Sequence, residues 1–203
     1  MKKERSPKMK KTRSKPVESI PEIEGYTIEQ RTIGMLKANI VAMVVLVLLL
    51  LAGLFVMYAI HAEAFSSLPI GAVALFLLFF TVGVVVHELI HGFTWMLATH
   101  SGFSHLRFGV MAGGVYCHID VPMTKRKYVA GALMPLLLLG IIPFVVSFFA
   151  GSFILMLLGA TLTACAMGDV MIVWAIRKEQ PDTLVYDHPT EGGCVVYRPV
   201  SKA

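Results

Sequence analysis

Residues 69–98 read PIGAVALFLLFFTVGVVVHELIHGFTWMLA, a stretch that is apolar almost throughout but contains a His-Glu-x-x-His motif in its second half. A helix of roughly 20 apolar residues spans the hydrocarbon core of a membrane. Pro69 is a favourable residue for the first turn of such a helix. The stretch is therefore predicted to be a transmembrane helix that carries the HELIH motif of residues 87–91 within it.

Apolar blocks on both sides of this helix predict three further crossings. Residues 40–60 contain no charged side chain, and residues 128–168 form a 41-residue block without a charge, which is long enough for two helices. Residues 149–152, Phe-Ala-Gly-Ser, provide a turn inside that block. At 56% hydrophobic and 15% charged residues, the chain lies outside the composition of ordinary soluble domains. The sequence predicts an all-α polytopic membrane protein with four transmembrane helices, at about 39–60, 69–98, 128–148 and 153–176.

Lysine and arginine residues mark one side of the expected membrane protein. Residues 1–16 contain eight of them against one Glu, and others occur in the loop 101–127 and just after the fourth helix. The connectors 61–68 and 149–152 contain none. Cytoplasmic segments carry such an excess of positive charge, so both termini and the 101–127 loop are expected in the cytoplasm. The basic N-terminus is expected to attract anionic lipid, and we draw no inference of nucleic-acid binding from it.

These patterns divide the chain into three parts. Residues 1–38 form a basic cytoplasmic tail and linker, residues 39–178 a four-helix transmembrane domain that holds the motif, and residues 179–203 a cytoplasmic C-terminal tail. Within the 101–127 loop, apolar residues alternate on both sides of Gly113-Gly114, which predicts a small β-hairpin, with a loop lying on the membrane surface as the alternative. The three cysteines are scattered and form no CxxC motif, so reduced thiols are expected.

The HELIH motif predicts a catalytic zinc site. His87 and His91 are four residues apart, so both imidazoles project from one face of a helix. A catalytic zinc ion takes three protein ligands and leaves a position for water, whose pKa it lowers from about 15.7 to about 7. Glu88 is placed to accept the proton of that water as general base and to return it to the leaving amine. The transmembrane domain is therefore expected to be the catalytic domain, with Zn²⁺ as its cofactor.

Asp169 is the expected third ligand. Apart from Glu88 it is the sole acidic residue in any expected helix, and a lone carboxylate in a membrane needs a cation. His87 and Asp169 each lie about 26 Å along their helices, so they share one depth. Trp95 and Trp174 follow the two sites, and we expect an interfacial aromatic belt there. Gly168 is expected to let the helices approach closely.

Other polar residues compete with this assignment. His100, His105 and His118 belong to the 101–127 region or its border, and His118 could reach back over the site. Asp120 could replace Asp169, although a loop carboxylate needs no metal to explain it. Asp187-His188 are interpreted as a surface hydrogen-bonding pair in the C-terminal tail.

Several of these residues together resemble a known family. HELIHG, the Ala130 to Pro135 stretch, Gly168-Asp169 and the segment 187–193 resemble the bacterial membrane family of putative zincin peptidases, which is in turn similar to the site-2 intramembrane zinc metalloproteases. The resemblance covers about residues 70–195 and implies peptide hydrolysis at the bilayer of a bacterial plasma membrane, with His87, His91 and Asp169 as ligands and Glu88 as base. The chain lacks the Asn-Pro-rich signature of site-2 proteases before Asp169, and it has no PDZ-like domain.

Three classes of function are compared on this basis. An intramembrane zinc metalloendopeptidase that acts on membrane proteins or peptides is the leading hypothesis, and the 101–127 hairpin could hold an extended substrate at its edge. The alternative is a non-catalytic, zinc-stabilised membrane scaffold or regulator, although a structural site has no use for Glu88. A metal transporter would need ionisable residues across the whole bilayer, and here they lie at one depth.

Overall fold

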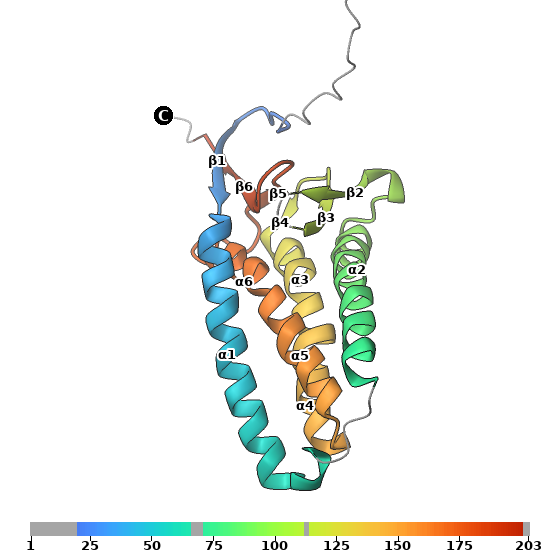
Figure 1. Cartoon of the computed structure of the whole chain (residues 1–203). Coiled ribbons are helices and arrows are strands. Elements are labelled where there is room, and N and C mark those ends of the chain that lie inside the picture. Colours follow the sequence, from blue (N-terminus) through green and yellow to red (C-terminus); the bar gives the residue numbers. More distant parts are fainter. Residues whose placement is uncertain (1–19, 66–70, 112–113, 201–203) are drawn as a thin grey trace, which may run out of the picture.

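Four long helices form the body of the protein. The computed structural model describes residues 20–65, 71–111 and 114–200. Each helix is long and apolar enough to cross a membrane, and in Figure 1 the helices run along one another. They are α1 (Met35–Ile60), α2 (Ala72–Thr99), a third run Lys125–Ala150 and a fourth run Phe153–Ala175. The described residues thus contain four helices of this kind, which is the predicted number, whereas Pro69, the predicted start of the second helix, lies outside these residues.

The third and fourth runs are interrupted helices. The third consists of α3 (Lys125–Pro135), a π-helical turn (Leu136–Ile141) and α4 (Ile142–Ala150). The fourth consists of α5 (Phe153–Cys165) and α6 (Met167–Ala175). Between them the chain turns at Gly151, whose φ of 59° lies in the left-handed region that favours glycine, and the Ser152 hydroxyl accepts a hydrogen bond from the N–H of Leu155. The predicted turn at 149–152 is therefore confirmed.

Two small antiparallel sheets accompany the helices, and the four-stranded one corrects the prediction of an all-α fold with a single hairpin. The hairpin of β2 (Leu106–Met111) and β3 (Gly114–Ile119) confirms the predicted one. A four-stranded sheet has the order β1-β6-β5-β4, with β1 at Tyr26–Thr32, β4 at Met123–Thr124, β5 at Leu184–Asp187 and β6 at Gly193–Pro199. Three of these strands come from segments that we expected to be a linker and a tail. All strands lie at one end of the helices (Figure 1).

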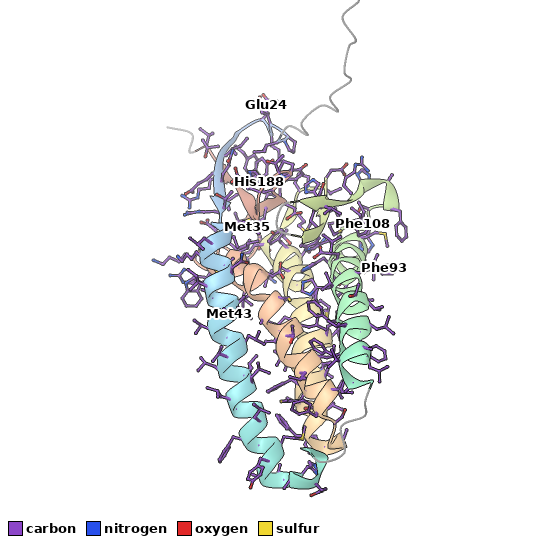
Figure 2. The ribbon with its side chains drawn as sticks, viewed as in Figure 1. Glu24, Met35, Met43, Phe93, Phe108 and His188 are labelled. Atoms are coloured by element: carbon purple, nitrogen blue, oxygen red, sulfur yellow. The ribbon has the colours of Figure 1, made fainter. Side chains whose placement is uncertain are left out.

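The buried core lies where the helix ends meet the strands. Trp95, Tyr128, Ile176 and Val196 belong to one cluster there, with contributions from helices and from both sheets. Along their length the helices also present large apolar side chains outward, as Met43 does on α1 in Figure 2. The protein thus has a layer of strands at one end of an apolar helical body.

Two expectations about helix packing are wrong. Trp95 is 4% exposed and packs in the core, so it is no interfacial residue, whereas Trp174 is 65% exposed. A Cβ on Gly168 would lie 4.0 Å from Ile33, and no helix contact depends on this glycine. Close approach occurs instead at Gly83, where a Cβ would lie 2.9 Å from Leu162, because α2 and α5 pack together there.

Candidate metal centre

Helices α2 and α6 bring the three predicted ligands together. His87 and His91 lie one turn apart on the buried face of α2, and Asp169 lies in the first turn of α6. The Asp169 Oδ2 atom is 3.3 Å from His87 Nε2 and 3.5 Å from His91 Nε2. The ligand atoms of His87, His91 and Asp169 lie within 4.8 Å of one another. Among the described residues, these three form the group that could hold a metal ion.

The donor set fits a zinc ion. Zinc bound tetrahedrally at about 2.0–2.1 Å separates neighbouring ligand atoms by roughly 3.4 Å, close to the two distances from Asp169. His91 Nδ1 is 2.9 Å from the Gly131 carbonyl, to which it donates, so the Nε2 lone pair is left for a metal. His87 Nδ1 is buried and has no such partner among the described residues. Two imidazoles and a carboxylate are typical ligands of a catalytic zinc site.

Glu88 is held next to this group by the hairpin. The backbone N–H of Cys117 donates to Glu88 Oε2 at 2.7 Å. This contact follows from the register of the hairpin. The Asp120 N–H donates to the His105 carbonyl, which makes these two residues a hydrogen-bonded pair, and such pairs alternate with non-hydrogen-bonded pairs along an antiparallel ladder. Cys117 and Phe108 form a non-hydrogen-bonded pair, so the Cys117 N–H points away from β2. One carboxylate oxygen of Glu88 is thus fixed by strand β3.

A cavity of about 150 Å³ joins the group to the strand layer. Glu88, His91 and Asp169 line it from the helices, and the hairpin and α3 supply further walls. The turn between β5 and β6 closes the cavity with residues 187–189 and 191–193. The site is therefore formed jointly by the helices and by the two sheets.

Aromatic rings connect the group to the strands. The Trp95 ring stacks on His91, with centroids 5.2 Å apart, and on Tyr128, at 5.4 Å. The Trp95 indole N–H donates to the Tyr128 carbonyl at 3.0 Å. The Tyr128 hydroxyl in turn donates to Asp187 Oδ1 at 3.2 Å. His91 is therefore supported by a packed series of rings that ends on strand β5.

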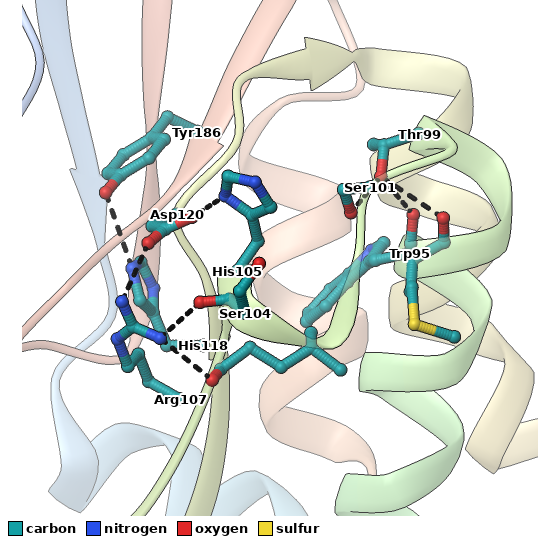
Figure 3. A network of polar contacts seen from close by, with 11 residues as sticks. Trp95, Thr99, Ser101, Ser104, His105, Arg107, His118, Asp120 and Tyr186 are labelled. Atoms are coloured by element: carbon teal, nitrogen blue, oxygen red, sulfur yellow. Dashed lines mark hydrogen bonds and ion pairs between the residues drawn. The ribbon is translucent and has the colours of Figure 1, made fainter.

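Asp187 and His188 are buried, so their interpretation as a surface pair is wrong. They are 8% and 9% exposed. The Asp187 carboxylate is 3.1 Å from His118 Nδ1, and His118 Nε2 is 3.4 Å from the Tyr186 hydroxyl, a contact drawn in Figure 3. The sequence does carry a signal for this arrangement: LVYD and CVVY are short β-prone runs separated by a segment that contains Pro189, Gly192 and Gly193, which is the pattern of a hairpin.

The remaining candidate ligands have other roles. His100 ends α2 in the left-handed conformation, with φ of 56°. His105 Nδ1 lies 2.6 Å from Asp120 Oδ1, and Arg107 also binds the Asp120 carboxylate, in the network at the base of the hairpin shown in Figure 3. Neither these histidines nor His118 belongs to the described group of converging ligand atoms.

Two histidines one helical turn apart, with a glutamate directly after the first, form the H-E-x-x-H motif of the class of proteins called zincins. The sequence model of the family described as "Putative zincin peptidase" matches residues 80–184, which include the HELIH motif and Asp169. The chain belongs to this family, whose name implies zinc and metallopeptidase activity. Neither a curated protein nor a solved structure matches the chain.

Proposed function

We propose that the protein is an intramembrane zinc metalloendopeptidase, similar in type to the site-2 proteases, that hydrolyses peptide bonds of membrane-associated proteins or peptides. One observation carries the proposal: Glu88 lines the same cavity as His91 and Asp169, with one carboxylate oxygen fixed by the Cys117 N–H. A carboxylate placed beside a metal-ligand set without joining it is suited to proton transfer.

The membrane placement is part of the proposal. The helices carry large exposed apolar side chains, as Phe55 and Leu97 show at 74% and 63% exposure, and lipid would cover them. The distribution of Lys and Arg favours a cytoplasmic position for both termini and the strand layer. The bacterial plasma membrane is the proposed location, and anionic lipid is the proposed partner of the basic N-terminus.

The residues divide the chemistry between them. His87, His91 and Asp169 would hold a zinc ion, which would lower the pKa of a water and polarise the scissile carbonyl. Glu88 accepts the proton of the attacking water at a carboxylate oxygen and delivers it to the leaving nitrogen. Its hydrogen bond from Cys117 keeps the carboxylate in one orientation through both transfers.

The hairpin offers a place for the substrate backbone. Strand β3 pairs with β2 on one side, and within the described ranges no other strand pairs with its second edge. That edge faces Glu88. An extended peptide that adds to the outward backbone groups of β3 other than the Cys117 N–H, which Glu88 binds, would run past the cavity with its carbonyl groups accessible. A helical substrate segment does not allow this.

The substitution Glu88→Gln tests the proposal. Gln keeps an amide oxygen that accepts from Cys117, so the fold and the ligand set remain, but it accepts no proton. We expect zinc content equal to wild type and a loss of about 10²–10⁴-fold in cleavage of end-labelled single-span membrane peptides in liposomes. His91→Ala should lose both zinc and cleavage. Near-normal turnover by Glu88→Gln contradicts the proposal.

The alternative function predicts a different result from the same proteins. A zinc-stabilised scaffold or regulator would bind zinc and be destabilised by chelation, but wild type would cleave none of the peptides. Zinc analysis of wild type and His91→Ala, together with thermal unfolding, separates this outcome from a protein that binds no metal.

A further inference from the structure

His188, at the start of the turn between β5 and β6, has an unusual set of hydrogen bonds. Its ring is buried, and its Nδ1 accepts from the backbone N–H groups of Glu191, at 3.0 Å, and Thr190, at 3.3 Å. A ring nitrogen that accepts two N–H groups carries no proton, so the neutral imidazole has its proton on Nε2. The backbone of the turn therefore fixes one tautomer of His188.

The Nε2 atom of His188 has no hydrogen-bond partner within the described chain. Leaving a buried donor without an acceptor costs about 1–3 kcal/mol, so such a group in a folded protein needs an explanation, for which a catalytic role is one physical reason. His118 lines the same cavity, but its two nitrogens face Asp187 and Tyr186. Among the described residues that line the cavity, His188 is the one with an unpartnered buried side-chain atom.

The position of His188 is fixed from both sides. Its backbone N–H donates to the Gly193 carbonyl at 3.1 Å, across the turn. The preceding residue, Asp187, is bound by His118 and Tyr128. His188 thus lies in a turn that is held by hydrogen bonds at the strand-bearing end of the molecule, where Figure 2 labels it, and it lines the same cavity as Glu88 and Asp169. It also lies beyond residue 184, where the match to the zincin family ends.

We propose that His188 is a catalytic residue that donates a hydrogen bond from Nε2–H to the carbonyl oxygen of the scissile peptide bond; this role rests on the proposed hydrolysis. The water oxygen bonds to the carbonyl carbon, the π electron pair of the C=O bond moves to its oxygen, and Glu88 takes the water proton. In the second step the electron pair on the oxygen forms the C=O bond again and the C–N bond breaks. The electron pair of the C–N bond goes to the nitrogen, which also receives the proton held by Glu88. His188 stabilises the negative oxygen and transfers no proton.

Two substitutions test the acceptor Nδ1 and the donor Nε2–H of His188 separately. His188→Asn retains a side-chain acceptor close to the backbone, where Asx turns accept the following N–H groups, and lacks the donor at the Nε2 position. His188→Gln reaches farther with an amide donor and loses the Nδ1 acceptor. His100→Asn is the matched control, because His100 is exposed and Asn adopts its left-handed conformation readily.

We expect His188→Asn to lower kcat for the labelled membrane peptides by about 10²–10³-fold with little change in KM, in zinc content or in Tm. His188→Gln should recover part of kcat, and His100→Asn should match wild type. Turnover by His188→Asn within about threefold of wild type, with zinc bound, overturns the role of His188 and leaves the proposed hydrolysis standing.

A binding measurement supplies a readout that needs no turnover. The probe is a phosphinic pseudopeptide with Phe and Leu side chains, whose anionic tetrahedral group replaces the scissile carbonyl. We expect His188→Asn to bind it about 10²-fold more weakly than wild type, and His100→Asn to bind it equally. Equal affinity in all three overturns the inference. If wild type binds the probe more tightly than His188→Asn but cleaves none of the peptides, the proposed hydrolysis is overturned, whereas the hydrogen bond from His188 to the oxygen of the bound group is supported.

Discussion

Replacing Gly131 by alanine should disturb the centre without touching any proposed ligand. Gly131 faces the indole of Trp95: a Cβ would lie 2.8 Å from Trp95 Cε2 and closer still to its Nε1. Ordinary contact begins at 3.4 Å, so the ring must move by more than half an ångström. Trp95 is 4% exposed and stacked between His91 and Tyr128, so little room exists for that movement.

The magnitude follows from the interactions that this movement breaks. Overpacking a core position costs about 1–3 kcal/mol, and loss of the Trp95-to-Tyr128 hydrogen bond about 0.5–1.5 kcal/mol. Alanine regains roughly 0.5–1 kcal/mol through its better helix propensity. These contributions combine to about 0.5–4 kcal/mol, so we expect the free energy of unfolding of Gly131→Ala to fall by about 2 kcal/mol. Zinc affinity should fall as well, because the Gly131 carbonyl orients His91.

Reversible unfolding in mixed detergent micelles and zinc titration measure the two effects. Gly168→Ala is the control, since this helical glycine has its nearest neighbour, Ile33, at 4.0 Å. The control should equal wild type or exceed it slightly in stability. Wild-type stability and zinc affinity in Gly131→Ala would refute the packing argument.

Three further predictions concern other parts of the molecule. Burial raises the pKa of the Cys117 and Cys194 thiols from 9.0 to about 12, so both thiols stay protonated in the folded protein at a pH where the unfolded chain ionises them. The free energy of unfolding should therefore fall as the pH rises from 9 toward 12. Unfolding titrations should show a flatter slope when both cysteines are replaced by Ala. Glu63→Cys and Lys178→Cys should react with a membrane-impermeant maleimide from opposite sides of the membrane in oriented vesicles, and labelling from one side would contradict the proposed topology. Gly151→Ala should lower Tm, by an amount corresponding to about 1 kcal/mol, because its φ of 59° disfavours a side chain; an unchanged Tm would show that the turn adapts.

The helices and the convergence of His87, His91 and Asp169 could be predicted from the sequence for one physical reason. Ionisable side chains are costly in a membrane, so the few that occur in long apolar segments must serve a site or bind one another. The spacing of the two histidines and the matched depth of Asp169 were then enough to place them together. The hairpin could be predicted because apolar alternation brackets two glycines.

The four-stranded sheet could not be predicted in the same way. Its strands are short, and Ile28 pairs with Tyr197, far away along the sequence, so no local pattern records the partner. The sequence pattern of β5 and β6 does indicate a hairpin, but the burial of Asp187 depends on His118 and Tyr128, which are far away along the sequence. The burial of Asp187 and His188 was missed for this reason. The prediction that Trp95 lies at the membrane interface was wrong because its ring packs against Gly131, which has no side chain to exclude it. Hydropathy does not record such complementarity between two helices.

The order of the strands has a consequence for biosynthesis. Strand β6, at Gly193–Pro199, lies inside the sheet between β1 and β5, and it is translated after all four long helices. A nascent chain that has just completed α6 possesses His87, His91, Glu88 and Asp169 but not the turn that closes their cavity. In the proposed membrane topology, insertion of the described helices therefore precedes completion of the centre. A chain that ends at α6 therefore carries the proposed ligands and base in a cavity that still lacks the walls supplied by residues 187–189 and 191–193.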